Sequence, residues 1–375
     1  MTASTASAAS AASAAPADLL YSDTEDELRA AVRSLLADRS SPAAVLARLE
    51  QDRPYDPELW NTLATGIGAA GLLVPEKLGG QGASHREAAV VLEELGRSVT
   101  PAPYLTSAVV ATEILLACAP ASPGATALLG ELAAGRTVCV PALPLTLGPG
   151  GPLPAGPPTA PVAAVADAAA AHTFLVLADS GLYAVPAAEA TRADRTPLDL
   201  TRPLATVTPH PGAGTLLADP ATARHAVRRG LLAGAGLLAS EQLGLADWCL
   251  TETVGHLRTR HQFNRPVGSF QALKHRLAQL WLDVASARAA ARAAADALAT
   301  GAADTELVVS VAQAYCSGVA VRAAEECVQL HGGIGMTWEH PAHLYLKRAK
   351  ADSLALGTAA HHRTRLAALA DLPSP

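Results

Sequence analysis

The feature that most constrains the fold is a segment from Pro141 to Pro161, where twelve of twenty-one residues are proline or glycine. Proline has no backbone N–H to donate and glycine loses much entropy on folding, so this density excludes a helix and allows a sheet only at its edge. Long helical patterns flank the segment in a chain of 375 residues. The sequence therefore predicts helices, a small irregular region and helices again, in about two or three domains.

Short apolar runs with turn residues between them predict a small middle β domain at residues 136–220. The runs Thr173–Ala178 and Leu182–Val185 flank Asp179-Ser-Gly181 and are typical of a β-hairpin. Further short strands are expected at 205–208 and 215–217.

The flanking regions predict a mainly α fold, with an N-terminal helical domain at residues 18–135 and a C-terminal antiparallel helical bundle at 221–375. Ser22-Asp-Thr-Glu25 has the spacing of a capping box ahead of an apolar stripe. Long helices are expected at 221–258, 269–299 and 304–330, followed by two shorter ones, and short links between such helices favour a bundle. Residues 1–17, mostly Ala, Ser and Thr, predict a disordered tail.

Composition excludes several classes of function. A formal net charge of −6 without a basic block argues against nucleic acid as a partner. We expect no signal peptide and no apolar run of membrane-spanning length, so no membrane partner. The five cysteines form no Cys-x-x-Cys pair and no metal spacing, which predicts reduced thiols in a cytoplasmic protein.

Most of the functional information lies in the stretch from Arg258 to His275, between two long helical patterns. Arg260 and Gln262 can face one phosphate or carboxylate, and Phe270-Gln271 stands where the next helix begins. Free backbone N–H groups at a helix start favour an anion, and a guanidinium beside them suits a pyrophosphate. The alternative is a solvated helix end, where arginines interact favourably with the negative end of the helix dipole.

Two other groups of residues have competing readings. Glu339, His340 and His343 resemble a metal cluster, but no third imidazole lies within sequence reach, so a solvated helix start is preferred and no metal is expected. His331-Gly-Gly could be a helix C-cap or a lipase-type oxyanion loop. The second reading lacks the Gly-x-Ser-x-Gly elbow that would accompany it.

Three motifs, in order, make the chain resemble the acyl-CoA dehydrogenase family. They are Leu73-Val-Pro-Glu-Lys-Leu-Gly-Gly-Gln-Gly-Ala-Ser84, Arg260-His-Gln-Phe263 with Phe270-Gln271, and Gln329-Leu-His-Gly-Gly-Ile-Gly335 with Thr337-Trp-Glu-His-Pro341. The resemblance implies an N-terminal helical domain, a middle β domain and a C-terminal helical bundle. It also implies flavin adenine dinucleotide (FAD) across a subunit interface and the α,β-dehydrogenation of an acyl-CoA substrate.

The resemblance assigns the cofactor contacts residue by residue. Positions that match the family's contacts to the adenine and pyrophosphate are Arg260, Gln262, Phe263, Phe270, Gln271, Gln329, Leu330, Gly332 and Gly333. Thr358, after Gly357, matches a further cofactor contact. The glycines would let the backbone approach the cofactor closely.

The family's catalytic base and its β-domain flavin loop have no counterpart in this sequence. The base is a glutamate before Gly-Thr near the C-terminus, or on the first bundle helix; here Leu356 and Gly234 occupy those positions. Glu241, two helical turns beyond Gly234, is expected to be a buried, paired glutamate. No catalytic residue is therefore assigned.

The sequence keeps the contacts to the adenine and pyrophosphate but lacks the base and the flavin loop, and this combination gives three hypotheses. Ala239-Ser-Glu-Gln-Leu-Gly244 and Asp199-Leu-Thr-Arg202 resemble a bacterial branch that acts on steroid or other bulky acyl-CoA side chains, some of whose members form α2β2 complexes. The first hypothesis is a subunit that lacks the base and works with a second acyl-CoA dehydrogenase-like subunit. The others are an independently active homo-oligomer of secondary metabolism and a non-redox acyl-CoA-binding or scaffold protein.

Overall fold

The computed structural model describes residues 17–51 and 55–372. The expected disordered tail lies outside these residues, apart from Ala17. The described helices and strands follow the predicted order of helices, short strands and long helices.

The N-terminal part is built from short and medium-length helices, of which α4 is the most buried. The capping box predicted at Ser22 is confirmed, because its hydroxyl accepts from Glu25 N and the Glu25 carboxylate accepts from Ser22 N. The bounds of these helices are α1 Asp23–Arg39, α2 Pro42–Glu50, α3 Pro57–Asn61, α4 His85–Arg97, the π-helix η4 Tyr104–Ala111, α5 Thr112–Cys118 and α6 Pro123–Ala133.

The middle part holds two small sheets. One has the strand order β1-β3-β4-β7 and the other β2-β6-β5. The strands are β1 Cys139–Pro141, β2 Val162–Ala166, β3 Thr173–Ala178, β4 Gly181–Pro186, β5 Ala190–Arg195, β6 Leu204–Pro209 and β7 Thr215–Ala218. The predicted hairpin is confirmed, with Ala178 paired to Gly181. The proline- and glycine-rich segment joins β1 to β2.

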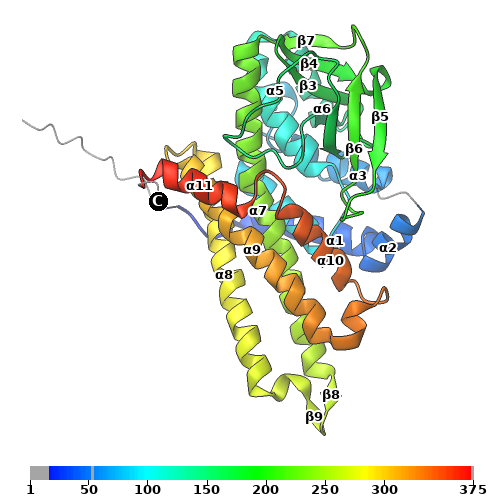
Figure 1. Cartoon of the computed structure of the whole chain (residues 1–375), viewed down its shortest axis with the longest axis vertical. Helices are drawn as coiled ribbons and strands as arrows, with labels where there is room; N and C mark the ends of the chain where they lie inside the picture. The colour runs from blue at the N-terminus through cyan, green and yellow to red at the C-terminus, as the bar shows by residue number, and fades with distance from the viewer. Residues whose placement is uncertain (1–16, 52–54, 373–375) are drawn as a thin grey trace, which may run out of the picture.

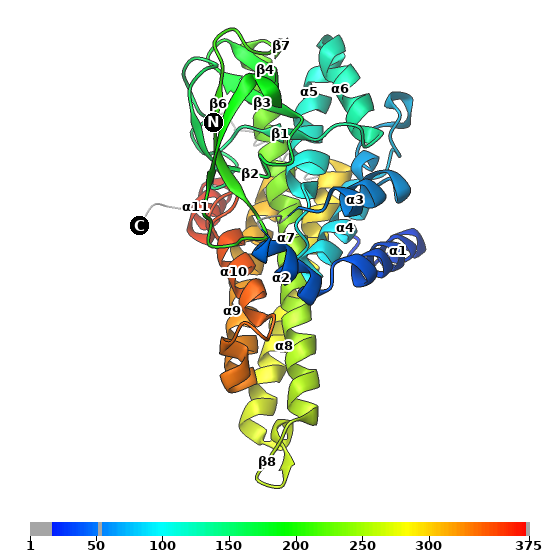
Figure 2. The ribbon, with the colours of Figure 1, turned by 90° about the vertical axis from the view of Figure 1, so that its right-hand side faces the viewer.

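The C-terminal part is a bundle in which α7 Pro220–Thr259 runs from the sheets to the far end of the molecule (Figures 1 and 2). A two-stranded hairpin there, β8 His261–Gln262 and β9 Arg265–Pro266, leads into α8. The remaining helices are α8 Gln271–Thr300, α9 Thr305–His331, α10 Ala342–Asp352 and α11 Ala359–Leu369.

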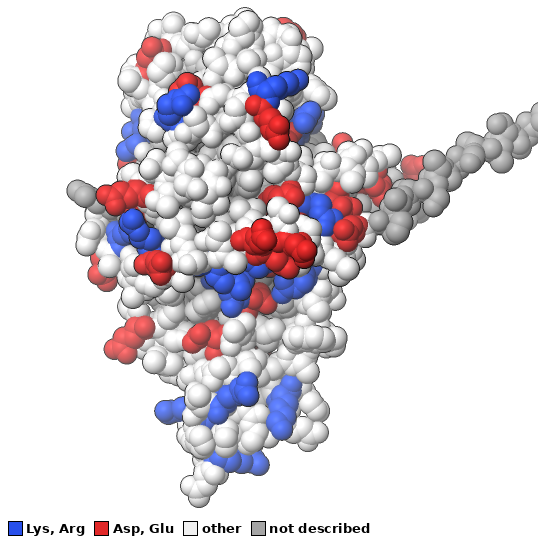
Figure 3. Space-filling model, turned by 180° about the vertical axis from the view of Figure 1, so that it is seen from behind, with Lys and Arg blue, Asp and Glu red and all other residues white. Residues whose placement is uncertain are grey.

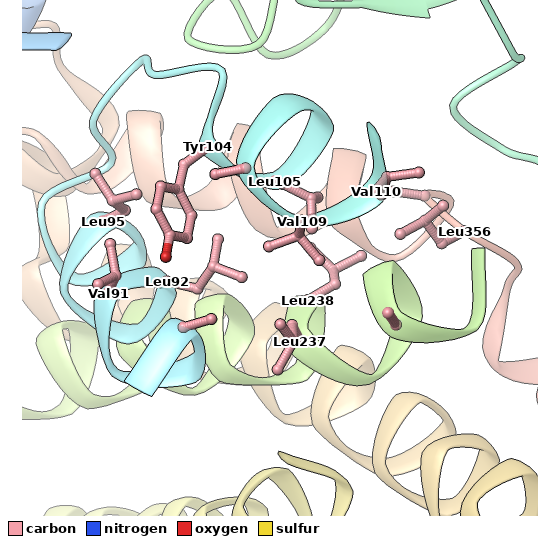
Figure 4. Close-up of a cluster of buried hydrophobic side chains, with 14 of the residues drawn as sticks. Val91, Leu92, Leu95, Tyr104, Leu105, Val109, Val110, Leu237, Leu238 and Leu356 are labelled. Atoms are coloured by element: carbon pink, nitrogen blue, oxygen red, sulfur yellow. The ribbon is translucent and has the colours of Figure 1, made fainter. Parts of the chain in front are cut away.

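The three parts share one apolar core. Figure 4 shows Tyr104, Leu105 and Val109 of η4 facing Leu92 of α4 and Leu238 of α7. Burial of such side chains contributes roughly 1.5–3 kcal/mol each relative to exposure. The core therefore fixes η4 against the first bundle helix.

One expectation about membranes needs correction. Two segments, Tyr104–Ala121 and Thr305–Met336, are long and apolar enough to span a bilayer by length and composition. In the folded chain, 67% and 56% of their most apolar windows are buried against other parts of the protein. Their hydropathy is accounted for by core packing.

Helices α4 and α7 cross with their backbones in contact, and glycine makes this approach possible. A Cβ atom on Gly244 would lie 1.9 Å from Glu93 O, and one on Gly96 would lie 2.2 Å from Glu241 O. Neither carbonyl can move without moving its helix. The crossing therefore sets the distance between the N-terminal helices and the bundle.

Gly244→Ala should destabilise the protein by about 3 kcal/mol or more, because the added methyl group must push two packed helices apart. Thermal or urea unfolding followed by circular dichroism would measure this. Gly255→Ala is the matched control on the same helix, where a Cβ meets nothing within 4 Å. There, helix propensity predicts a gain of up to about 1 kcal/mol. Equal effects of the two substitutions would contradict the close crossing.

Candidate functional site

A buried ion network ties the β region to the bundle and includes the only candidate base considered from the sequence. Arg202, in the loop before β6, donates from Nη2 to both oxygens of Glu241 on α7, at 2.6 and 2.8 Å. Arg348 of α10 donates from Nη1 to Glu241 Oε1 at 2.6 Å. Glu241 is 2% exposed. Both of its oxygens are engaged, so it is a buried, paired glutamate as expected.

Two aspartates complete this network. Arg202 Nη1 binds Asp352 Oδ1 at 2.7 Å, and Arg348 Nε binds Asp199 Oδ2 at 2.5 Å. Burial would raise the pKa of Glu241, but the two guanidinium groups outweigh burial and hold it below its ordinary value. Burial, with Glu241 nearby, raises the pKa of Asp352 to about 8. Two arginines thus bind three carboxyl groups, and burial beside these other acids favours the protonated form of Asp352.

This proton makes stability depend on pH with a definite sign. Asp352 has an ordinary pKa of 3.8 and a folded value of about 8. Between these values the folded state holds one more proton than the unfolded state, so this group's contribution to stability falls as pH rises. Asp352→Asn removes the titration, and its unfolding temperature should fall less than that of the wild type between pH 5 and pH 8. The exposed Asp194→Asn control should follow the wild type; identical profiles for all three proteins would contradict the assignment.

The two positions where the resemblance expects a base pack against each other beside a small, mostly apolar pocket. A Cβ on Gly234 would lie 2.6 Å from Val110 Cγ2 and 3.1 Å from Leu356 Cδ1. A cavity of only about 40 Å³ remains, lined by Leu105, Thr106, Val110, Pro141, Leu143, Pro144, Leu145, Ala166, Leu231 and Leu356. None of these side chains is an acid, so nothing in this lining can accept a proton from a substrate.

The proline- and glycine-rich segment closes this space. Leu356 N donates to Leu145 O at 2.7 Å. A Cβ on Gly148 would meet Gly357 Cα at 2.9 Å, so the two backbones are in contact. His361 Nε2 donates to Pro149 O at 2.8 Å, which fixes the segment on the first turn of α11. Sites for small molecules usually measure about 300–1,000 Å³. This pocket does not fit a flavin ring or an acyl chain.

Leu356→Glu should therefore restore no activity, although it puts a carboxyl group back where the family carries its base. A charged group in this apolar space has no partner, so we expect a loss of about 2 kcal/mol or more in stability. Unfolding measurements and an acyl-CoA dehydrogenase assay on the purified chain would test this. Leu356→Met is the volume-matched control and should cost less than about 1.5 kcal/mol. Turnover by the Leu356→Glu chain alone would show that the pocket opens.

The far end of the bundle is built differently, as an exposed, basic tip. Phe263 and Asn264 both have positive φ, at 52° and 60°, so the hairpin between β8 and β9 ends in a type I′ turn. Phe263 is 85% exposed in this conformation, which is unusual for a bulky residue. Strain of this kind, kept at an exposed position, is typical of functional sites.

The predicted cofactor contacts in this hairpin and at the start of α8 lie together on the tip. Phe263 and Phe270 make an edge-to-face contact with ring centroids 6.1 Å apart. The Arg265 guanidinium lies 3.8 Å from the Phe270 ring centroid. Helix α8 begins at Gln271, two residues after the predicted start, so unpaired backbone N–H groups of its first turn are present at this end.

Positive charge gathers on this tip. Arg258, Arg260, Arg265 and Lys274 are exposed, and none makes an ion pair with another described residue. Figure 3 shows basic side chains near this end of the molecule. Guanidinium groups, amides and backbone N–H groups together suit a diphosphate.

The second predicted contact segment lies at the end of α9. Gln329, Gly332 and Gly333 are exposed, and a Cβ on either glycine would meet nothing within 4 Å. The two segments are linked through His331, whose ring centroid lies 4.3 Å from that of His256 on α7, one turn before Arg260. The open glycine backbone leaves room for a ligand at this end of the bundle.

Thr358 is separated from the other predicted contacts. It caps α11, where its hydroxyl accepts from His361 N, beside the closed pocket. Helix α8 begins at the basic tip and runs for 30 residues toward the end of the bundle where α11 lies (Figure 1). At 1.5 Å per residue that is about 45 Å. Within this chain, Thr358 thus lies away from the other predicted contacts.

Sequence reasoning missed two contributors to these sites. Arg265, which covers Phe270, was not singled out, although its place in the basic stretch was a usable signal. The closure by Leu145 and Gly148 left no local signal, because it depends on a contact between residues about two hundred positions apart.

Comparisons with known proteins place this geometry in a family. The acyl-CoA dehydrogenase N-terminal domain matches residues 22–130, and the C-terminal domain of the same family matches residues 224–370. The acyl-CoA dehydrogenase IpdE2 of Mycolicibacterium smegmatis is 37% identical over 348 residues, which cover 92% of this chain and 99% of that protein. The chain belongs to the acyl-CoA dehydrogenase family.

Solved structures agree. The ChsE4-ChsE5 complex of Mycobacterium tuberculosis contains a chain with a TM-score of 0.79 and 26% identity, covering 95% of this chain and 100% of that one. A chain of the Tcur3481-Tcur3483 steroid acyl-CoA dehydrogenase (ACAD) has a TM-score of 0.80 and 27% identity, covering 93% of this chain and 98% of that one. The predicted fold class, with helical, β and helical parts, is confirmed.

Family membership also gives the cofactor and the class of reaction. Acyl-CoA dehydrogenases are FAD-dependent oxidoreductases that act on acyl-CoA thioesters. The donors at the basic tip fit the diphosphate of FAD, whereas the pocket at Leu356 does not fit its ring.

Proposed function

We propose that this chain is the subunit without a catalytic base in a hetero-oligomeric acyl-CoA dehydrogenase. The observation that carries the proposal is the contrast between an open, basic tip and a closed, apolar pocket on the same chain. The tip would bind the diphosphate end of an FAD whose ring, with the base, lies on a second subunit. This agrees with the missing base at Leu356 and Gly234.

In this proposal each residue of the tip has a defined task. Arg260 and Gln262 hold the diphosphate by charge and hydrogen bonding, while Phe263 and Phe270 cover the adenine side. Gln271 begins α8 and places the free backbone N–H groups of its first turn next to the diphosphate. Gln329, Leu330, Gly332 and Gly333 form the second wall. The bound FAD supplies the hydride acceptor, and this chain's residues position it without moving a proton.

Apolar side chains left uncovered on the bundle support an oligomer. Trp281 and Leu282 of α8 are 60% and 53% exposed. On α9, Val311 and Tyr315 are also exposed. Large apolar side chains gathered on a surface mark interaction sites. The two heteromeric structures described above are consistent with a second, unlike subunit as the occupant.

The substrate we propose is a bulky acyl-CoA such as a steroid-derived thioester, because one of the two similar structures is a steroid ACAD. In the proposed complex the partner's pocket, not this chain's closed one, receives the acyl group.

The alternatives are less well supported. An independently active homo-oligomer needs a base, and Glu241 is held by two arginines away from the Leu356 pocket lining. A non-redox scaffold leaves the basic tip unexplained. The homo-oligomer predicts flavin and turnover in the chain alone, and the scaffold predicts that tip substitutions have no effect on a complex.

The test combines flavin content with activity. The chain purified alone should carry no stoichiometric flavin and show no turnover. Co-expressed with an acyl-CoA dehydrogenase-like subunit that has the glutamate, it should yield a yellow, active complex. Arg260→Ala in that complex should weaken FAD binding about tenfold or more, because a charge-assisted contact contributes roughly 1.5–3 kcal/mol.

Two controls sharpen this measurement. Arg258→Ala removes the same charge two residues away and should have a smaller effect on FAD affinity. Arg136→Ala removes an exposed arginine that pairs with Glu131 in the N-terminal part and should have none. Stoichiometric flavin with turnover in the isolated chain would contradict the proposal, as would unchanged FAD affinity in the Arg260→Ala complex.

A further inference from the structure

A cluster of imidazole and carboxylate groups lies where α7 meets the end of α9, and the proposed function does not use it. The ring of His331, the last residue of α9, lies between those of His256 and His340, with centroids 4.3 and 4.2 Å away. Glu252 lies one turn before His256. Ligand atoms of Glu252, His331 and His340 all lie within 4.8 Å of one another.

His331 presents one nitrogen to this cluster. The side chain is 5% exposed, and its Nδ1 donates to the Cys327 carbonyl oxygen at 2.7 Å. A neutral imidazole has one proton, so the lone pair is on Nε2. That atom is buried and has no hydrogen-bond partner among the described residues. A histidine anchored to a backbone carbonyl through one nitrogen, with the other free, is typical of a metal ligand.

We propose that Glu252, His331 and His340 bind a divalent transition-metal ion, with zinc as the best match. Two imidazoles and one carboxylate are ligands that zinc takes, with water in a fourth position. The Glu252 side chain is 47% exposed, so the site opens to solvent on one side. The ion would join α7 to the end of α9 and to the segment before α10. Its two histidine ligands would then lie on either side of Gly332-Gly333 in the sequence.

Binding requires small movements at the rim. Tetrahedral zinc bonds of about 2.0–2.1 Å place the ligand atoms about 3.4 Å apart, and His340 Nε2 now lies 4.0 Å from Glu252 Oε1. Rotation of the half-exposed Glu252 side chain can close this gap. Ala342 N donates to His340 Nδ1 at 3.2 Å, and coordination through Nε2 gives up this long hydrogen bond.

The site departs from the expectation that no metal binds. The grouping of Glu339, His340 and His343 considered from the sequence is not the one that the fold assembles, because His343 packs edge-on against Trp338, with centroids 4.6 Å apart. The missing imidazole comes from α9 and the carboxylate from α7. Both lie outside the local sequence window.

The experiment titrates the untagged full chain with Zn²⁺ by calorimetry and with Co²⁺ by visible absorbance. We expect saturable binding, a cobalt spectrum typical of four-coordination, and displacement of Co²⁺ by Zn²⁺. Glu252→Gln and His340→Gln should each weaken binding by at least about tenfold. His331→Ala should do the same.

His343→Gln is the matched control, with the same change three positions along the chain, and should bind zinc like the wild type. If His331→Ala does not fold, Glu252→Gln decides the matter, because its side chain is half-exposed and its loss leaves the core intact. Two outcomes would overturn the proposal: no saturable binding by the wild type, or equal affinity in Glu252→Gln and wild type, which would mean adventitious binding only. Neither outcome bears on the flavin proposal, whose readouts are flavin content and turnover.

Discussion

The contact on which the arrangement of the chain depends is the buried network of Arg202 and Arg348 with Asp199, Glu241 and Asp352. These five residues come from the loop before β6, from α7 and from α10, so they join the β region to two bundle helices. Removing one partner from a buried pair typically costs about 3–5 kcal/mol, because the other charge is left without compensation. Directional ion pairs of this kind hold the two parts in a single relative position.

That position has a chemical consequence. With the β region held on α7, the proline- and glycine-rich segment lies against the loop that carries Leu356, and Gly234 faces both Leu356 and Val110. The space that remains is apolar and small. At the opposite end the bundle projects beyond the other domains, which leaves the β8–β9 hairpin and the start of α8 open (Figure 2). One chain thus has a closed end and an open end.

The resemblance to a family was predictable because its motifs are local. The Leu73–Ser84 loop, the Arg260–Gln271 stretch and the Gln329–Gly335 loop each lie within a few residues, and their order along the chain is fixed by the sequence. The capping box at Ser22 and the hairpin after Thr173 were predictable for the same reason. Strands β1, β2 and β5 were missed, because β1 and β2 are short and adjoin the proline-rich segment, and β5 is almost entirely exposed.

The sequence by itself determined the helical character of the chain, the order of its parts, the basic stretch before α8 and the absence of a glutamate at 356 and 234. Each of these depends on residue type and short spacing. Only the tertiary structure decided that Glu241 is paired with two arginines, that Leu145 closes the Leu356 pocket, and that Glu252, His331 and His340 meet. These contacts join residues far apart in the chain. They are set by how the helices and the β region pack, which no local pattern records.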